Sequence, residues 1–298
     1  MLDILIPTIS QGLMWSLLAV GVYLSFRVLD IADLSVEGTF PLGAAVAAAV
    51  LTAGGSILTA MLLALAAGSI AGVVTALLTT KMRIPALLAG ILSMIGLYSV
   101  NLHVMGRANL SLLRVDTVFT FVQGFVADYV LASLVVGAAS AALVGGAVYW
   151  FFGTELGTAI RATGSNSQMA RAQGVNTDTM IILGLLIGNG LVALSGALVA
   201  QANGFADVGM GVGTIVIGLA SVIIGEVLFG TRSFMNSLIS VILGSIVYRL
   251  VIALVLQMGM PPNDLKLFTA ILVAIALCMP LLKARYDART RRRSGGRA

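Results

Sequence analysis

The stretch ILTAMLLALAAGSIAGVVTALLTT, residues 57–80, contains no charged side chain. The hydrocarbon core of a bilayer is about 30 Å thick, and about 20 apolar residues in an α-helix can cross it. Similar stretches recur along the 298-residue chain, which is 59% hydrophobic and 10% charged, with a mean hydropathy of +1.07. Soluble domains carry about 25% charged residues. The composition therefore predicts an all-α polytopic membrane protein and excludes a water-soluble enzyme, a disordered chain and a DNA-binding domain.

Nine stretches have the composition of membrane spans. The second and the seventh are short and rich in Gly and Ala, and they follow the polar segments 30–33 and 203–209. We expect residues 1–282 to form a single transmembrane domain and residues 283–298 to form a basic tail. The predicted spans are Ile4–Phe26, Val36–Leu51, Ile57–Thr80, Ile84–Val104, Tyr129–Phe152, Met180–Ala200, Val212–Phe229, Phe234–Gln257 and Leu267–Leu282.

The positions of Lys and Arg predict the orientation, because cytoplasmic loops carry an excess of these residues. If the C-terminus is cytoplasmic, Arg107, Arg114 and Lys266 lie outside and Arg249 lies within a span, which leaves 13 of the 17 Lys and Arg on the cytoplasmic side. We therefore expect a multi-pass membrane protein with a cytoplasmic C-terminus. The basic tail is expected to touch anionic lipid rather than nucleic acid.

The polar segment 153–179 is longer than a minimal connection between neighbouring helices. A Gly after a helix and a Ser or Asn before one are stop and start signals. They predict one short helix over 155–163 that ends at Gly164, and a second that starts from a cap within 165–167 and ends at Gly174. The two helices share the repeat RATG and RAQG. The residues alone leave open whether this loop docks on another protein or is a solvated connection.

Motifs in three regions of the chain resemble those of ABC-transporter permeases of the branched-chain amino acid and ribose type. GTAIRATGSNSQMARAQGV (157–175) resembles the coupling loop of that family, and LDIADLSVEG (29–38) resembles the segment after its first helix. ADLSVEGTFPLG (32–43) and RIPALLAGILSM (83–94) are most similar to the tryptophan/tyrosine-type subgroup. Glu37 stands where the ribose-type pattern has Gly, so a sugar is the less expected substrate.

The resemblance implies the fold of a type II ABC importer, with an inverted repeat, and a division of labour between chains. Two permease subunits, expected to be a homodimer, form the pathway for a small organic solute, expected to be an amino acid and in particular an aromatic one. An extracytoplasmic binding protein delivers the solute, and a cytosolic ATPase dimer docks on the coupling loops. The residues expected to couple this chain to the ATPase are Glu155, Arg161, Gly164, Asn166, Arg171 and Gly174.

The chain itself is not expected to be an enzyme. It lacks the phosphate-binding motif G-x-x-x-x-G-K-[ST], and none of its three lysines follows a glycine. ATP and Mg²⁺ are therefore expected on the partner ATPase, with no cofactor in this chain. With one cysteine, Cys278, and one histidine, His103, an intrachain disulfide and a histidine metal cluster are excluded, and we expect no metal site.

Charged residues inside spans are costly and usually face a partner or a cavity. We predict that Arg249 pairs with Asp207, with attraction of a substrate carboxylate as the alternative. Glu226 is expected to form an ion pair or a helix-end contact near Arg232, with a contact at a gate as the alternative.

Two polar segments lead into the short spans, residues 33–38 and 207–213, and under the predicted topology they start on opposite sides of the membrane. This is the behaviour of an inverted repeat and points to the pathway between them. Asp33 and Glu37 are expected to cap the helix that they begin, with substrate binding as the alternative. The residues predicted for the pathway are Asp33, Ser35, Glu37, Asp207, Glu226 and Arg249.

Small and polar residues within the spans are expected to pack helices together. Gly68-x-x-x-Gly72 and Gly184-x-x-x-Gly188 are predicted packing faces. The polar residues on or just after the sixth span are predicted to form hydrogen bonds between helices; they are Asn189, Ser195, Gln201 and Asn203.

The alternative function is a secondary transporter driven by an ion gradient. Its coupling groups would be Asp33, Glu37, Glu226 and Arg249. The loop 153–179 distinguishes the two functions, because disrupting it should stop an ABC permease, whereas a secondary transporter should respond to loss of the membrane potential.

Overall fold

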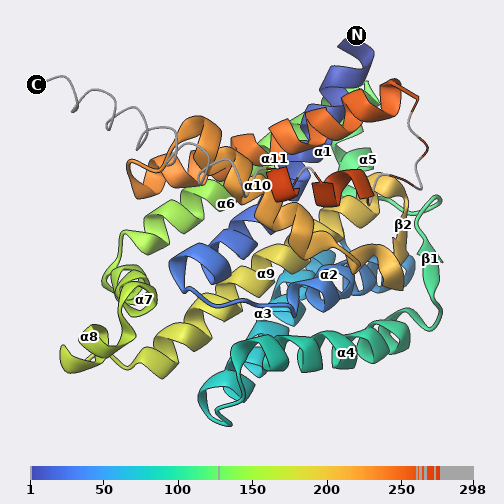
Figure 1. Cartoon of the computed structure of the whole chain (residues 1–298). Helices are drawn as coiled ribbons and strands as arrows, with labels where there is room; N and C mark the ends of the chain where they lie inside the picture. The colour runs from blue at the N-terminus through green and yellow to red at the C-terminus, as the bar shows by residue number, and fades with distance from the viewer. Residues whose placement is uncertain are drawn as a thin grey trace, which may run out of the picture.

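The computed structural model describes residues 2–126, 128–259, 261, 264, 267–271 and 273–275, which form a bundle of α-helices (Figure 1). Two short strands and two irregular helical turns complete it: β1 (Asn109–Ser111), β2 (Phe205–Asp207), the π-helical turn η1 (Leu24–Val28) and the 3-10 turn η2 (Val208–Gly211). The α-helices are α1 (Leu2–Tyr23), α2 (Val36–Thr52), α3 (Ile57–Thr80), α4 (Ala86–Met105), α5 (Val118–Gln123), α6 (Tyr129–Phe152), α7 (Glu155–Ser165), α8 (Ser167–Ala172), α9 (Thr177–Asn203), α10 (Thr214–Phe229) and α11 (Phe234–Gln257).

Seven helical segments among the described residues are long and apolar enough to cross a membrane, which confirms the all-α membrane fold. The predicted total of nine spans is not confirmed. The second span, α2, has 17 residues, about 25 Å at 1.5 Å per residue, and is shorter than the apolar core of a bilayer. The ninth, Leu267–Leu282, is helical at 267–271 and 273–275. Its remaining residues and the predicted tail 283–298 lie outside the described residues.

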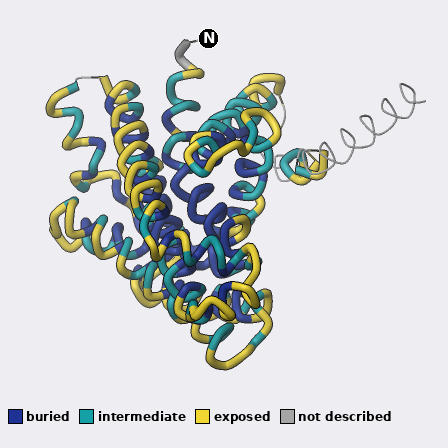
Figure 2. Tube along the Cα trace, turned by 90° about the vertical axis from the view of Figure 1, so that its left-hand side faces the viewer, coloured by how far each residue is buried: buried dark blue, intermediate teal, exposed yellow. Residues whose placement is uncertain are grey.

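Helix α9 runs through the middle of the bundle and packs against α1, α2 and α3 (Figure 1). Buried residues gather in the middle and exposed residues lie along the outside (Figure 2). Glycines allow this packing: a Cβ at Gly43 of α2 would lie 1.9 Å from the Ala193 oxygen, and one at Gly72 of α3 would lie 2.3 Å from the Leu185 oxygen. The backbones of α2 and α3 therefore approach α9 directly.

The predicted packing faces are confirmed. Gly68 and Gly72 both face α9, while Gly184 meets Leu29 and Gly188 meets Gly21. The polar residues of α9 bond other segments, as predicted: the Ser195 hydroxyl donates to the Met14 oxygen at 2.9 Å, and Gln201 Oε1 accepts from the Val118 N–H at 3.0 Å.

The two ends of the bundle carry different structures (Figure 1). At one end β1 pairs with β2 in antiparallel register, with Asn109 opposite Asp207 and Ser111 opposite Phe205. At the other end lie α7 and α8, the two predicted helices of the loop 153–179. Asn166 caps α8 by accepting from the Met169 N–H at 2.9 Å.

Gly174 ends the α8 segment with a φ of +85°, a left-handed conformation that favours glycine. Gly164 has a different role from the predicted one, because α7 continues past it to Ser165. A Cβ at Gly164 would lie 1.9 Å from the Val28 oxygen. This glycine therefore lets α7 rest on the end of η1.

Candidate functional site

A buried polar network lies where the chain enters α2. Asp33 and Asn189 are 3% and 1% exposed. The Asn189 amide donates to Asp33 Oδ2 at 2.7 Å, and the Ser35 N–H donates to Asp33 Oδ1 at 2.9 Å. Thr39 donates from its hydroxyl to Asn189 Oδ1 at 2.8 Å. Asp33 therefore accepts the N–H of Ser35, the residue that precedes α2, rather than an N–H of the helix itself, and it fixes this start to α9.

Glu37 caps a helix other than its own. Its Oε1 accepts the N–H of Gly213, the residue that precedes α10, at 3.0 Å. The expectation that Glu37 caps α2 is therefore wrong. A Cβ at Gly211 would lie 1.9 Å from the Glu37 carbonyl oxygen. The starts of α2 and α10 thus meet inside the bundle. The prediction that residues 33–38 and 207–213 start on opposite sides of the membrane is not confirmed by this contact.

Arg249 stacks on an aromatic ring instead of pairing with an acid. Its Cζ lies 4.0 Å from the centre of the Trp15 ring, a cation–π distance. Its Nε is buried and has no hydrogen-bond partner among the described residues. The predicted pair with Asp207 is wrong, because Asp207 is held at the strand end by the Gly209 N–H at 2.7 Å and the Asn109 amide at 3.2 Å.

A cavity of about 320 Å³ lies beside Arg249. Its walls come from the start of α10, from α11 and from the helical residues 269–270. The guanidinium of Arg249 lines the cavity, and the carboxylate of Glu37 bonds the N–H of Gly213, one of the lining residues, without lining the cavity itself. The other lining residues are Val212, Val216, Ile217, Tyr248, Ile252, Thr269 and Ala270.

Glu226 pairs with Arg27, so the predicted pair with Arg232 is wrong. Arg27 Nε donates to the two Glu226 carboxylate oxygens at 2.9 and 3.1 Å, and Arg27 Nη2 also contacts Glu226 Oε2. The π-helical turn η1 carries Arg27 alongside the last turns of α10. This ion pair ties the end of α1 to the end of α10.

The predicted coupling residues divide into two groups. Arg161 and Gly164 face the bundle: the Arg161 Cζ lies 5.2 Å from the centre of the Phe234 ring, and Gly164 meets Val28. The others are exposed. Arg171 donates to the Thr177 hydroxyl at 2.7 Å and lies 3.9 Å from the Asp178 carboxylate. The exposed residues are Glu155, Asn166, Arg171 and Gly174.

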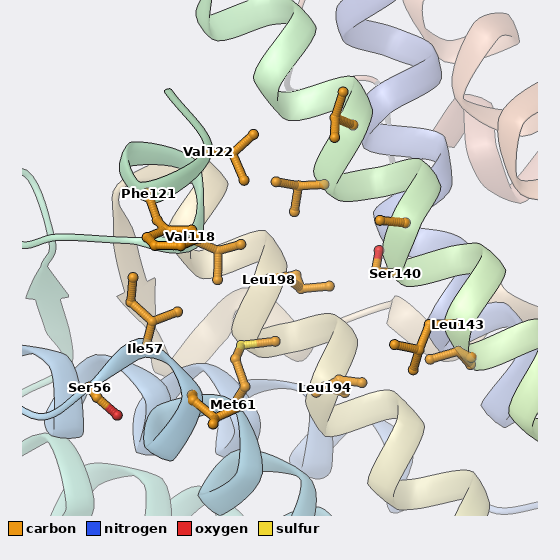
Figure 3. Close-up of a pocket in the computed structure, with 15 residues that line it drawn as sticks. Ser56, Ile57, Met61, Val118, Phe121, Val122, Ser140, Leu143, Leu194 and Leu198 are labelled. Atoms are coloured by element: carbon orange, nitrogen blue, oxygen red, sulfur yellow. The ribbon is translucent and has the colours of Figure 1, made fainter. Parts of the chain in front are cut away.

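A larger cavity of about 650 Å³ lies between α3, α5, α6 and α9 (Figure 3). Apart from the hydroxyls of Ser56 and Ser140, its side chains are apolar, among them Met61, Phe121 and Leu143. It offers no charged group to orient a polar solute, so we do not assign it to the pathway.

Sequence reasoning missed two members of these clusters. Trp15 lies 234 positions before Arg249, and no spacing in the sequence links them. Thr39 looks like an ordinary helix residue. Because it lies one turn after Ser35 on α2, helical periodicity could have placed it on the same face.

The fold, the meeting of α2 and α10 and the loop α7–α8 define a transport protein of the membrane. The family model "Branched-chain amino acid transport system / permease component" matches residues 4–277. The chain therefore belongs to this family of ABC permeases.

Two relatives align along almost the whole chain. One is the "Tyrosine transport system permease protein" of Clostridioides difficile (strain R20291), to which the chain is 41% identical. The alignment covers 90% of this chain and 88% of the relative. The other is an uncharacterized protein of Rickettsia prowazekii (strain Madrid E), to which the chain is 35% identical. The alignment covers 93% of this chain and 97% of the relative.

A third relative is more distant. The "Autoinducer 2 import system permease protein LsrC" of Yersinia pseudotuberculosis (serotype O:1b, strain IP 31758) is 30% identical over 76% of this chain and 64% of its own. No solved structure matches the chain.

Proposed function

We propose that this chain is the permease subunit of an ATP-driven importer of amino acids, with aromatic amino acids as the substrates. The observation that carries the proposal is the 41% identity to a protein named as a tyrosine transport permease. Two copies of the chain form the pathway in the bacterial inner membrane, with the C-terminus in the cytoplasm. A cytosolic ATPase dimer binds ATP and Mg²⁺, and an extracytoplasmic binding protein delivers the substrate.

The exposed face of α7 and α8 is the proposed docking surface for the ATPase. Leu156 and Met169 are 50% and 53% exposed there, and Glu155 and Arg171 lie beside them. Apolar side chains with charges around them are typical of protein interfaces. On its other side α7 rests on Val28 and α9. A displacement of the loop by the ATPase would therefore reach α1 and α9.

This docking is tested by purifying the tagged chain gently from its own cells and quantifying the ATPase that accompanies it by mass spectrometry. We expect the double variant Met169→Glu/Arg171→Glu to lose about tenfold or more of the ATPase, because charge reversal at the centre of an interface is costly. Arg114→Glu, an exposed change beyond β1 at the other end of the bundle, is the matched control. Wild-type recovery of ATPase by the double variant would contradict the docking surface.

The cavity beside Arg249 supports an amino acid as the substrate. A guanidinium binds a carboxylate in a planar, two-pronged geometry, and the Glu37 carboxylate near the same helix start suits an ammonium group. The remaining walls are largely apolar, which suits an aromatic side chain. A volume of about 320 Å³ lies at the lower end of the range of about 300–1,000 Å³ for small-molecule sites. In this proposal Asp33 and Ser35 hold the turn before α2 in place.

The substrate site is tested with the complete complex in proteoliposomes, by following uptake of labelled tyrosine. Loss of a charged hydrogen bond costs about 1.5–3 kcal/mol, so we expect Arg249→Gln to lower uptake about tenfold or more and Arg249→Lys to retain part of it. Arg114→Gln is the control, and size-exclusion chromatography checks folding. Wild-type uptake by Arg249→Gln would remove Arg249 from the pathway.

The same proteoliposomes separate this proposal from an ion-coupled secondary transporter. Uptake should require enclosed ATP on the side of the ATPase and should persist when ionophores collapse the ion gradients. Uptake that is driven by a membrane potential without ATP would establish the secondary transporter instead.

A further inference from the structure

A second polar cavity, of about 530 Å³, opens where α6 ends and α7 and α11 begin. It is separate from the cavity of Arg249 and shares no residue with it. Among the described residues that line it, Arg161 carries the only charge and none is acidic. The other lining residues are Tyr149, Trp150, Phe152, Gly153, Thr154, Ser233, Phe234 and Met235.

The charge of Arg161 is uncompensated among the described residues. Its guanidinium stacks at 5.2 Å on the Phe234 ring, and its Nε is buried without a hydrogen-bond partner. The ion pairs found among the described residues, Arg27–Glu226 and Arg171–Asp178, do not involve it. A buried donor without a partner is costly, so this guanidinium is suited to an external anion.

Two helix starts add to the positive potential of this cavity. Thr154 precedes α7, which has 11 residues, and Ser233 precedes α11, which has 24 residues. Both residues line the cavity. The N-terminal ends of helices carry partial positive charge and the C-terminal ends partial negative charge. At this cavity the two helix starts outnumber the one helix end, that of α6.

Aromatic side chains place the cavity at the membrane surface. Tyr149 and Trp150 lie in the last turn of the membrane-spanning α6, and they are 48% and 73% exposed. Exposed Trp and Tyr at the end of a span are typical of the headgroup region of the bilayer. An anion that reaches Arg161 from the side of the bundle is therefore at the depth of lipid phosphates.

We propose that this cavity binds the headgroup of an anionic phospholipid in the leaflet on the side of α7 and α8. Arg161 donates to the phosphate, and Trp150 and Tyr149 pack along the glycerol and the upper acyl chains. Because Arg161 belongs to α7, the bound lipid contacts the same helix as the proposed ATPase. The lipid site does not depend on the proposed transport function.

The two tryptophans of the chain provide the test, since Trp150 lies at the cavity and Trp15 lies beside Arg249. In a Trp15→Phe background, the full chain is reconstituted in phosphatidylcholine vesicles that contain brominated phosphatidylglycerol or, in parallel, brominated phosphatidylcholine. Bromine quenches the fluorescence of nearby tryptophan. We expect phosphatidylglycerol to be preferred about fivefold at Trp150, which corresponds to about 1 kcal/mol for one basic residue at an anionic surface.

The preference should disappear in Arg161→Gln and persist in part in Arg161→Lys. The control Arg83→Gln removes an exposed charge on the same side of the bundle and should keep the preference. Equal quenching by both lipids, or an unchanged preference in Arg161→Gln, would overturn the proposal. So would relief of the quenching by inorganic phosphate, because the site would then select a soluble anion. If Trp15→Phe does not fold, native mass spectrometry of lipids bound to the wild-type chain and to Arg161→Gln answers the same question.

Discussion

At the scale of single residues, the buried carboxylate of Asp33 accepts a hydrogen bond from a single side-chain amide, that of Asn189. Asp33 accepts from Asn189 on one oxygen and from Ser35 on the other, and the exposure of Asp33 is 3%. A buried carboxylate that loses a donor is destabilised by about 1–3 kcal/mol or more. This amide is therefore a main support of the turn between η1 and α2.

We predict that Asn189→Ala lowers the apparent melting temperature of the detergent-solubilised chain, measured by fluorescence-detected size exclusion on heating. Asn203→Ala, an exposed change at the end of the same helix, should have little effect. Equal melting of the two variants would show that the carboxylate finds another donor.

Residues with local partners could be predicted from the sequence, and those with distant partners could not. The caps Asn166 and Asn176 act on N–H groups three residues ahead, so their spacing is visible in the sequence. Ion pairs depend on how helices are arranged in space. Arg249 stacks on Trp15 instead of pairing with Asp207, and Glu226 pairs with Arg27 instead of Arg232, so the partners of both residues lie far away in the sequence.

At the scale of elements, glycines determine how closely the helices approach α9. We predict that Gly43→Ala disrupts the contact of α2 with α9, because the added Cβ would lie 1.9 Å from the Ala193 oxygen. The yield of monodisperse protein should fall strongly. Gly96→Ala on α4 is the matched control, because nothing lies within 4 Å of its added Cβ and alanine favours a helix by about 1 kcal/mol. A similar yield for both variants would mean that α2 can shift without cost.

The ion pair between α1 and α10 gives a second prediction at this scale. Arg27 has a side chain that is 53% exposed and Glu226 one that is 12% exposed, so the pair is worth about 1 kcal/mol or less. We predict that Arg27→Glu lowers transport by placing two carboxylates together, and that Arg27→Glu/Glu226→Arg restores most of it. Arg232→Glu, which changes an exposed residue, should leave transport unchanged. No rescue in the double variant would mean that the pair has no part in transport.

Most spans could be predicted because apolar length is a local property. Ile57–Thr80, Tyr129–Phe152 and Phe234–Gln257 have the predicted bounds. The π-helical end of α1 and the approach of Glu37 to α10 could not be predicted in this way, because both result from packing between segments far apart in the sequence. The contact of Glu37 with Gly213, at the cavity beside Arg249, is one of these distant contacts.

At the scale of the whole molecule, the strands and the helices α7 and α8 lie at opposite ends of the bundle (Figure 1). In a Cys278→Ser background, a cysteine at Leu113, which is 84% exposed beyond β1, should react with a membrane-impermeant maleimide in intact cells. A cysteine at Gln168 of α8 should react only after permeabilisation. Labelling of both in intact cells would contradict the proposed cytoplasmic position of the loop.

The pairing of β1 with β2 also sets an order of events during synthesis. Asn109 can pair only after Asp207, 98 residues later in the chain, has been synthesised. At about 5–20 residues per second, the ribosome takes about 5–20 s to supply the missing strand. During that interval β1 has no partner strand, while α6 and α9, the candidate spans between the two strands, enter the membrane. The β1–β2 pairing therefore forms late in synthesis. It can form only when the helices between the two strands have been inserted in the correct order.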